Sequence, residues 1–247
     1  MPSQSSKQRK MFMSKFYGKY WITARDKYDI NRYHKNYIEL ICNSISIGSS
    51  IFDVGIGTGI PFADRLQKKG YVVHGIDISE DLILECKRNN KFISCLQGDA
   101  EDIQFEDNYF DCTYCFASTW YFPDLYKSID EMIRVTKKSG ILYFDIQNIN
   151  NETVRENYEK RIAQKSGLNL VINYVKNLIK IITRRGFVDW TNIIYDVPSN
   201  LEELLNHLKS KDIQDIKIFD ANNDLKEISI IDNAKINSGC LLFVIKV

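Results

Sequence analysis

Short apolar runs recur along the chain and predict a series of buried strands. They lie at 51–54, 72–78, 109–116 and 141–145, and apolar positions with helical spacing at 125–135 separate the last two. Runs rich in Ile, Val, Phe and Tyr are typical of strands, whereas apolar residues three and four positions apart are typical of helices. Two further strands are predicted near 216–219 and 241–245.

The segments outside these runs show other patterns. Residues 1–10 are polar and basic, and we expect a disordered tail there. Aromatic residues recur between 11 and 46 and predict a mostly helical arm. Apolar positions at 168–182 have helical spacing beside several Lys and Arg, the run at 187–195 alternates like a strand, and 199–205 reads as the capped start of a helix.

A turn with three alternate glycines follows the first strand directly. The stretch reads Ile51-Phe52-Asp53-Val54-Gly55-Ile56-Gly57-Thr58-Gly59-Ile60. Glycine has no Cβ, so it tolerates a positive φ and lets backbone N–H groups approach a bound molecule closely. A dinucleotide-binding turn reads G-x-G-x-x-G, and this chain has Ile60 where that pattern needs its third glycine. The turn therefore indicates a nucleotide-like ligand with a different motif.

The second strand ends in a carboxylate. Asp77 stands 22 residues after Gly55, where a carboxylate can accept hydrogen bonds from both hydroxyls of a ribose. Nicotinamide enzymes share this feature, so Asp77 indicates a ribose-containing ligand without choosing a family.

The order of these parts resembles that of the class I S-adenosylmethionine-dependent methyltransferases. Their first motif, acidic-x-G-x-G-x-G, is matched by Asp53, Gly55, Gly57 and Gly59, and their adenine segment is matched at 98–105, with Gln104 where the family usually has proline. Residues 136–140 read Thr-Lys-Lys-Ser-Gly where the family commonly has Leu-Lys-Pro-Gly-Gly. The resemblance covers about 47–146 in order.

This resemblance implies a three-layer, Rossmann-like α/β fold with helices on both faces of a seven-stranded, mostly parallel sheet. The implied strand order is 3-2-1-4-5-7-6, with only the last inserted strand antiparallel. S-adenosylmethionine is the implied cofactor and S-adenosylhomocysteine its product. The cofactor-binding residues that the resemblance implies are Asp53, Gly55, Gly57, Gly59, Asp77, Ile78, Asp99, Ala100 and Phe116. In the family the aspartate matched by Asp99 meets the adenine amino group.

We expect one methyltransferase domain over 11–247, with an N-terminal lid at 11–46 and an acceptor-site insertion at about 150–198. A helix packed on the sheet edge is the alternative to the lid. The lid positions of interest are Tyr17, Tyr20, Arg32, Tyr33 and His34. Further acceptor candidates follow the strands predicted at 109–116 and 141–145; they are Ser118, Thr119, Trp120, Tyr121, Asp145, Gln147 and Asn148. No catalytic base is assigned.

Elimination favours a small-molecule acceptor such as a metabolite, a sugar or a nucleotide-linked precursor. Residues 117–123 lack the Asn/Asp-Pro-Pro-Tyr segment with which adenine and glutamine N-methyltransferases hold a planar amide or amine. The alternatives are an RNA or protein methyltransferase, a methyltransferase-like binding protein without activity, and a nicotinamide-dependent oxidoreductase. The last is disfavoured by Ile60 and by the Asp99-Ala100 segment.

Composition narrows the partners and the location. The 33 basic and 32 acidic residues leave a net charge of +1, so we expect no nucleic-acid partner. Every apolar run is shorter than the roughly 20 residues of a membrane span, and we expect a cytoplasmic protein. Cys112 and Cys115 lie three apart in one strand and face opposite ways, so we expect packing and no metal site. For the segment at 168–185 we favour an apolar face packed on the core or in a homodimer over a membrane surface or an anionic acceptor.

Overall fold

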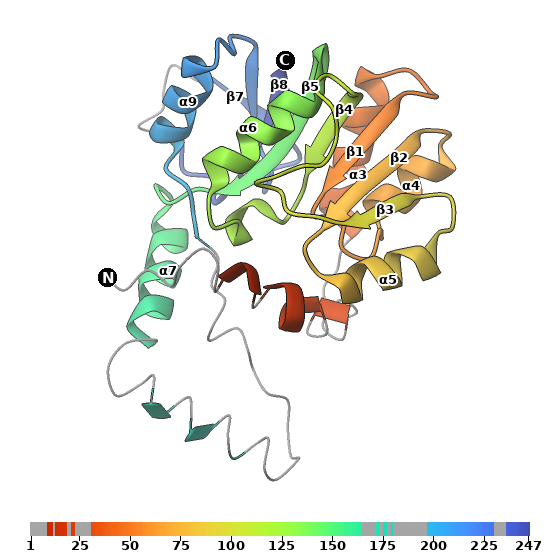
Figure 1. Ribbon diagram of the computed structural model, residues 1–247. Helices are drawn as coiled ribbons and strands as arrows, with labels where there is room; N and C mark the ends of the chain where they lie inside the picture. Colours follow the sequence, from red (N-terminus) through yellow and green to blue (C-terminus); the bar gives the residue numbers. More distant parts are fainter. Residues whose placement is uncertain are drawn as a thin grey trace.

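The computed structural model of the protein describes residues 9–11, 13–18, 21–22, 31–164, 171–172, 175–176, 179, 197–229 and 236–247. Its centre is an eight-stranded sheet in the order β3-β2-β1-β4-β5-β8-β6-β7 (Figure 1). The strands are β1 (Ser50–Val54), β2 (Val72–Asp77), β3 (Ser94–Gln97), β4 (Phe110–Cys115), β5 (Thr136–Gln147), β6 (Ile216–Asp220), β7 (Lys226–Ile228) and β8 (Cys240–Lys246).

Strands β1 to β5 run parallel to their neighbours, and β8 pairs antiparallel with both β5 and β6. The α/β fold and the order of the first seven expected strands are thus confirmed. The expected count of seven was wrong, because β7 adds an antiparallel edge strand beside β6. This strand has three residues, Lys-Glu-Ile, and so short a run gives no periodic signal in the sequence.

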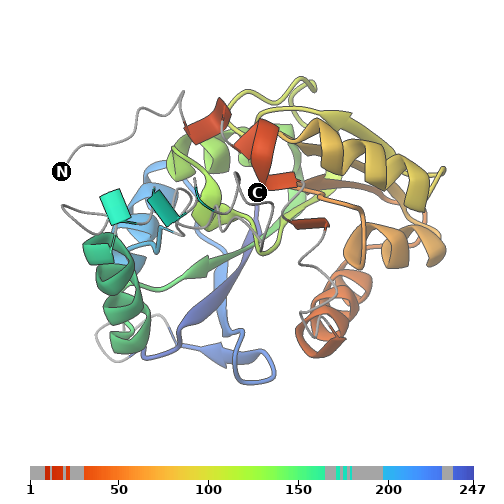
Figure 2. The same ribbon diagram turned by 90° about the horizontal axis from the view of Figure 1, so that it is seen from below.

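Helices cover both faces of the sheet. They are α3 (Asn31–Ser44), α4 (Phe62–Lys68), α5 (Glu80–Asn89), α6 (Leu125–Val135), α7 (Glu152–Gln164) and α9 (Leu201–Ser210), with single turns at η1 (Met13–Tyr17) and η3 (Thr119–Tyr121). One core cluster joins the sheet to α3, α4 and α5, and a second joins it to α6 and α9. Figure 2 shows α3 and α6 on opposite sides of the strands. The three-layer arrangement is therefore confirmed.

Local sequence signals explain where two of these helices begin. Asn200 caps α9, because its side-chain oxygen accepts the N–H groups of Glu202 and Glu203 at 2.9 and 3.3 Å. Asp124 caps α6 by accepting the N–H of Lys127 at 3.0 Å. The capped start expected at 199–205 is thus confirmed, whereas the strand expected at 187–195 lies outside the described residues.

Cysteines of the fourth strand pack as expected. Cys112 lies in the cluster with α3, α4 and α5, and Cys115 lies in the cluster with α6 and α9. Both side chains are fully buried. An offset of three along a strand therefore places them in different layers of the core.

A buried carboxyl group links the two central strands. Asp53 of β1 and Tyr114 of β4 are direct neighbours in the sheet, and the Tyr114 hydroxyl donates a hydrogen bond to Asp53 Oδ2 at 2.6 Å. Burial and, to a smaller extent, the nearby Asp77 charge together raise the pKa of Asp53 to about 8, although the tyrosine hydrogen bond lowers it. Asp53 is therefore mostly protonated at neutral pH.

This raised pKa predicts how stability depends on pH. Between the unfolded-state pKa of about 3.9 and the folded-state pKa of about 8, the folded protein keeps a proton on Asp53 that the unfolded chain releases. The free energy of unfolding should therefore fall as pH rises from 5 to 8. In Asp53→Asn this fall should be shallower by up to about 1 kcal/mol per pH unit.

Urea unfolding at several pH values measures both slopes. Asp107→Asn, which changes a mostly exposed carboxylate, is the control. Equal slopes in the wild type and in Asp53→Asn would show that Asp53 ionises normally in the folded protein.

Candidate functional site

The glycine turn after β1 has the backbone that its sequence predicts. Gly55, Gly57 and Gly59 have φ values of +83°, +56° and +75°, a region that side chains other than glycine rarely adopt. The N–H groups of Gly55 and Ile56 donate to the carbonyl of Ile76 at 2.8 and 2.9 Å. The turn is thus held against the end of β2.

The three glycines differ in what surrounds them. A Cβ on Gly55 would stand 2.6 Å from Ser118 Oγ, and one on Gly59 would stand 2.9 Å from Cys86 Sγ. A Cβ on Gly57 would meet no protein atom within 4 Å. Gly55 and Gly59 are therefore required by close packing, whereas Gly57 borders open space in which a ligand can lie.

Asp77 connects this turn to the start of α5. Its Oδ2 accepts the N–H of Gly57 at 3.0 Å, and its Oδ1 accepts the N–H of Ser79 at 2.9 Å. Burial raises the pKa of Asp77 to about 6, although these two backbone hydrogen bonds lower it. A carboxylate has about four acceptor sites, so two remain for hydroxyl groups of a ligand.

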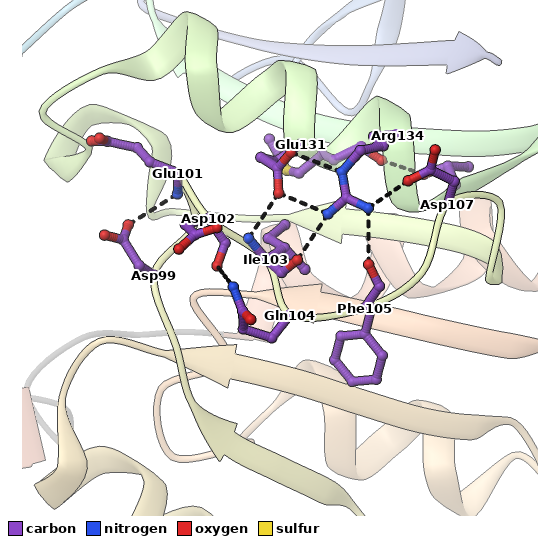
Figure 3. Close-up of polar contacts among 11 residues, drawn as sticks. Asp99, Glu101, Asp102, Ile103, Gln104, Phe105, Asp107, Glu131 and Arg134 are labelled. Atoms are coloured by element: carbon purple, nitrogen blue, oxygen red, sulfur yellow. Dashed lines mark hydrogen bonds and ion pairs between the residues drawn. The ribbon is translucent and has the colours of Figure 1, made fainter.

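Asp99 and Ala100 lie on the loop between β3 and β4, and Arg134 of α6 holds this loop in place (Figure 3). The guanidinium donates to the carbonyls of Ile103 and Phe105, each at 2.8 Å, and forms ion pairs with Glu131 and Asp107. Figure 3 shows the Asp99 side chain at the other end of the loop from these contacts. The position of Asp99 therefore depends on α6, which packs on the same face of the sheet as α9.

These elements enclose a pocket with about 590 Å³ of empty space, part of it open to solvent. Its lining includes Gly55, Asp77, Ile78, Asp99, Ala100 and Ser118. The structure thus brings together the glycine turn, the acid of the second strand and the adenine segment, although they are distant in the sequence. We call this space the first pocket.

Residues from the N-terminal segment complete the first pocket. Lys10 and Met13 line it, and Lys10 Nζ lies 2.6 Å from both Asp99 Oδ2 and Glu101 Oε2. Figures 1 and 2 show residues 9–18, in dark red, beside this end of the sheet. The expectation of disorder through residue 10 was therefore wrong for Arg9 and Lys10, because two ion pairs and a hydrogen bond from Arg9 to the Trp120 carbonyl hold them. Residues 1–8 lie outside the described residues.

A second pocket, with about 530 Å³ of empty space, lies beyond β4 and β5. Tyr37, Phe62, Phe116 and Trp120 supply aromatic walls, and Asp145 supplies a carboxyl group. The Phe116 ring contacts those of Tyr37 and Phe62, with centroids 4.6 and 4.9 Å apart. Phe116 was expected at the cofactor, yet its side chain belongs to this second pocket.

Asp145 is 4% exposed and holds the start of the loop after β4. Its Oδ1 accepts the N–H of Ala117 at 2.8 Å, and its Oδ2 accepts the Tyr37 hydroxyl at 3.4 Å. Burial raises the pKa of Asp145 to about 7, although these hydrogen bonds lower it. Among the described residues, no Lys, Arg or His forms an ion pair with this carboxylate.

Other acceptor candidates have different surroundings. Tyr121 and Ser118 line the first pocket, and the Thr119 hydroxyl donates to the Asp145 carbonyl. The geometry contradicts an acceptor contact at Asn148, because its buried amide donates to the carbonyls of Ile236 and Ser238. Gln147 lines neither pocket.

Five lid positions cannot be placed from their side chains. Tyr20 and the side chains of Tyr17, Arg32, Tyr33 and His34 lie outside the described residues. Most of the segment at 168–185 does so too. Its described apolar residues Val171, Ile172, Val175 and Ile179 are 40–57% exposed, so these four do not pack on the core of this chain as expected.

Sequence reasoning missed several residues of the two pockets. Lys10 stood in a tail expected to be disordered, and nothing in the spacing links it to Asp99. Phe62, Ala221 and Asn222 reach the second pocket from segments outside the matched motifs. The aromatic residues at 11–46 were the only available signal for Tyr37.

Within the described part of the chain, no helix is long and apolar enough to span a membrane. The same residues hold no group of three or more His, Cys, Asp or Glu side chains placed to bind a metal ion.

Comparisons with known proteins agree with this geometry. Residues 52–144 match the family described as "Methyltransferase domain". The chain is 34% identical over 95 residues to malonyl-[acyl-carrier protein] O-methyltransferase of Buchnera aphidicola, which covers 38% of each protein. It is 32% identical over 101 residues to demethylmenaquinone methyltransferase of Paenarthrobacter aurescens, which covers 40% of this chain and 38% of that protein. The chain thus spans about two fifths of the length of these curated relatives.

The fold is also found in solved structures. A SAM-dependent methyltransferase from Thermotoga maritima superimposes with a TM-score of 0.63 and 17% identity, over 96% of this chain and 99% of that one. Identity at this level shows a shared fold. The shared fold and the family match at 52–144 support a class I S-adenosylmethionine-dependent methyltransferase.

Proposed function

We propose that the protein transfers the methyl group of S-adenosylmethionine to a small-molecule acceptor. The observation that carries this proposal is the first pocket, which Gly55 of the glycine turn lines together with the carboxylates of Asp77 and Asp99. The alternatives are methyl transfer to RNA or protein, and a binding protein without activity.

The lining of the first pocket fits the parts of this cofactor. Asp77 keeps two acceptor sites for ribose hydroxyls after its bonds to Gly57 and Ser79. Ile78, Ala100 and Phe122 provide apolar surface for an adenine ring, and Asp99 provides an acceptor for its amino group. Asp53, by contrast, is buried against Tyr114 and acts through the position of the turn.

The remaining work of the protein is to position the acceptor. When bound, S-adenosylmethionine supplies a methyl group activated by its sulfonium, and the neutral thioether S-adenosylhomocysteine is a good leaving group. Holding a nucleophile in near-attack geometry can contribute about 7–11 kcal/mol to lowering the barrier. The second pocket provides a place for that nucleophile, since the short segment 116–122 contributes Ser118 and Tyr121 to one pocket and Phe116 and Trp120 to the other.

Relatives with different acceptors leave the substrate open. The matched relatives are named for two different acceptors, malonyl-acyl-carrier protein and demethylmenaquinone, and for this chain we infer a small-molecule acceptor. The cytoplasmic location and the homodimer stay predictions of the sequence. So do acceptor contacts by Tyr17, Tyr20, Arg32, Tyr33 and His34.

The function is tested by incubating the purified protein with methyl-labelled S-adenosylmethionine and a cell extract separated into small metabolites, RNA and protein. Label should appear among the metabolites. Label in RNA or protein would contradict the acceptor class, and no label in any fraction would favour a binding protein without activity.

A pair of glycine variants tests the cofactor pocket. Gly57 and Gly48 both have positive φ, at +56° and +88°, and a Cβ on either meets no protein atom within 4 Å. Gly57→Ala and Gly48→Ala should therefore lose similar stability, about 1 kcal/mol each. Only Gly57→Ala should weaken binding of S-adenosylhomocysteine, by tenfold or more, because its methyl group would occupy the open space beside the turn that Asp77 holds.

Calorimetric titration of both variants decides between the outcomes, with circular dichroism as the check on folding. The same affinity for S-adenosylhomocysteine in Gly57→Ala and Gly48→Ala would show that the cofactor does not occupy the space beside Gly57.

We also propose that residues 9–18 form part of a lid over the first pocket. Met13 is 8% exposed and lines the pocket, and a Cβ on Gly18 would clash with the Ser79 hydroxyl, so this segment packs closely against the start of α5. The ion pairs of Lys10 with Asp99 and Glu101 hold its other end.

Loss of the lysine charge should open this lid. Lys10→Met keeps most of the length of the side chain but removes both ion pairs, so S-adenosylhomocysteine should dissociate several-fold faster. Lys15→Met, at an exposed position of the same segment, is the matched control. Stopped-flow displacement measures the rates, and equal rates in the two variants would show that Lys10 does not hold the lid.

A further inference from the structure

We propose that the second pocket binds an organic ammonium group, so that the acceptor or the part of it seated there is a cationic amine. This inference rests on the proposed function only where it takes the bound amine to be part of the molecule that receives the methyl group. The pocket itself is defined by its lining, which combines the aromatic side chains of Tyr37, Phe62, Phe116 and Trp120 with the carboxyl group of Asp145.

The carboxylate of Asp145 is buried without a positively charged partner among the described residues. Asp145 is 4% exposed, and in the described part of the chain it has hydrogen-bond donors, Ala117 N–H and the Tyr37 hydroxyl, but no cationic partner. A buried carboxylate without a counter-charge is costly, and it must take up either a proton or a cation. Its two remaining acceptor sites are available to an ammonium group.

Aromatic side chains form much of the wall of the second pocket. Aromatic faces attract a cation through their negative π surface, by about 0.5–2 kcal/mol for each well-placed ring. Phe116 contacts Tyr37 and Phe62 in one continuous aromatic surface, and Trp120 lines the pocket as well. A ligand with an apolar body and a positive charge therefore finds both of its parts matched in this pocket.

The lining of the second pocket disfavours anionic ligands. The pocket includes no Lys, Arg or His among the described residues that line it. A carboxylate or phosphate ligand would meet the Asp145 charge in an apolar surrounding, where repulsion between like charges is strong. The other polar side chains of the lining belong to Tyr37, Trp120, Asn222 and Cys240, and none of them carries a positive charge.

The pocket also lies where an acceptor is needed. Ala117 lines it and is bonded to Asp145, and the next residue, Ser118, lines the first pocket. One turn of chain therefore separates the proposed ammonium site from the cofactor site. Asp145 is a positioning and binding residue in this proposal, because it would contact the charged end of the ligand directly.

Four probes of similar size test this inference on the full chain. Phenethylamine and benzyltrimethylammonium carry a positive charge, 2-phenylethanol is neutral and 3-phenylpropionate is negative. Calorimetric titrations are made with and without S-adenosylhomocysteine. We expect the two cations to bind at least tenfold more tightly than the alcohol, and the carboxylate to bind most weakly. Equal binding of cations and alcohol, or no binding of either cation, would overturn the proposal.

Asp145→Asn locates the selectivity. The amide keeps the size of the side chain and an acceptor for the Ala117 N–H, but it removes the charge. The preference for cations over the alcohol should fall to less than threefold. Asp111→Asn is the matched control. Asp111 also accepts a backbone N–H, that of Ser50 at 2.8 Å, but it lies near the first residue of β4, whereas the second pocket lies beyond the last. A full preference in a folded Asp145→Asn would contradict the assignment.

The outcomes separate this inference from the proposed function. Titration with S-adenosylhomocysteine alone tests the first pocket, whereas the four probes test the second pocket in its absence. If Asp145→Asn does not fold, the comparison of charged and neutral probes on the unaltered protein still decides the matter.

Discussion

Buried carboxyl groups at the carboxyl ends of three parallel strands are the constraint on which this site depends. Asp53, Asp77 and Asp145 end or nearly end β1, β2 and β5, and burial raises the pKa of each, to about 8, 6 and 7. The parallel order of these strands forces the three groups to one edge of the sheet. Each is tolerated because the protein supplies a donor, which is Tyr114 for Asp53 and backbone N–H groups for the other two.

This concentration of acidic groups explains the character of both pockets. A carboxylate that keeps unused acceptor sites in an apolar surrounding favours hydroxyl and cationic ligands over anions. The protein itself already uses this preference once, since Lys10 reaches Asp99 and Glu101 from the N-terminal segment. A sulfonium donor and an acceptor that carries an ammonium group are the ligands that this edge of the sheet would bind most readily.

Local chemistry made part of the structure predictable. Gly57 and Asp77 are tied to it by backbone conformation and by strand position, so their places followed from the order of residues. Asn148 misled the prediction because a strand-end position says nothing about whether an amide faces a ligand or, as here, the carbonyls at 236 and 238. β7 and Lys10 were out of reach, because a three-residue strand has no period and an ion pair across 89 residues leaves no local pattern.

The second pocket shows the same limit most clearly. Tyr37, Phe62, Asp145 and Asn222 come from four separate segments, and only the fold brings them together. Asp145 was singled out for its strand-end position, but its isolation from positive charge is a property of the packed structure.

The central claim is that the glycine turn and Asp77 bind S-adenosylmethionine and not a nicotinamide dinucleotide. Calorimetric titration of the purified protein with S-adenosylhomocysteine and, separately, with NAD⁺ tests it most directly. The account predicts saturable one-site binding of S-adenosylhomocysteine and no measurable binding of NAD⁺. Binding of NAD⁺, or of neither compound, would contradict it.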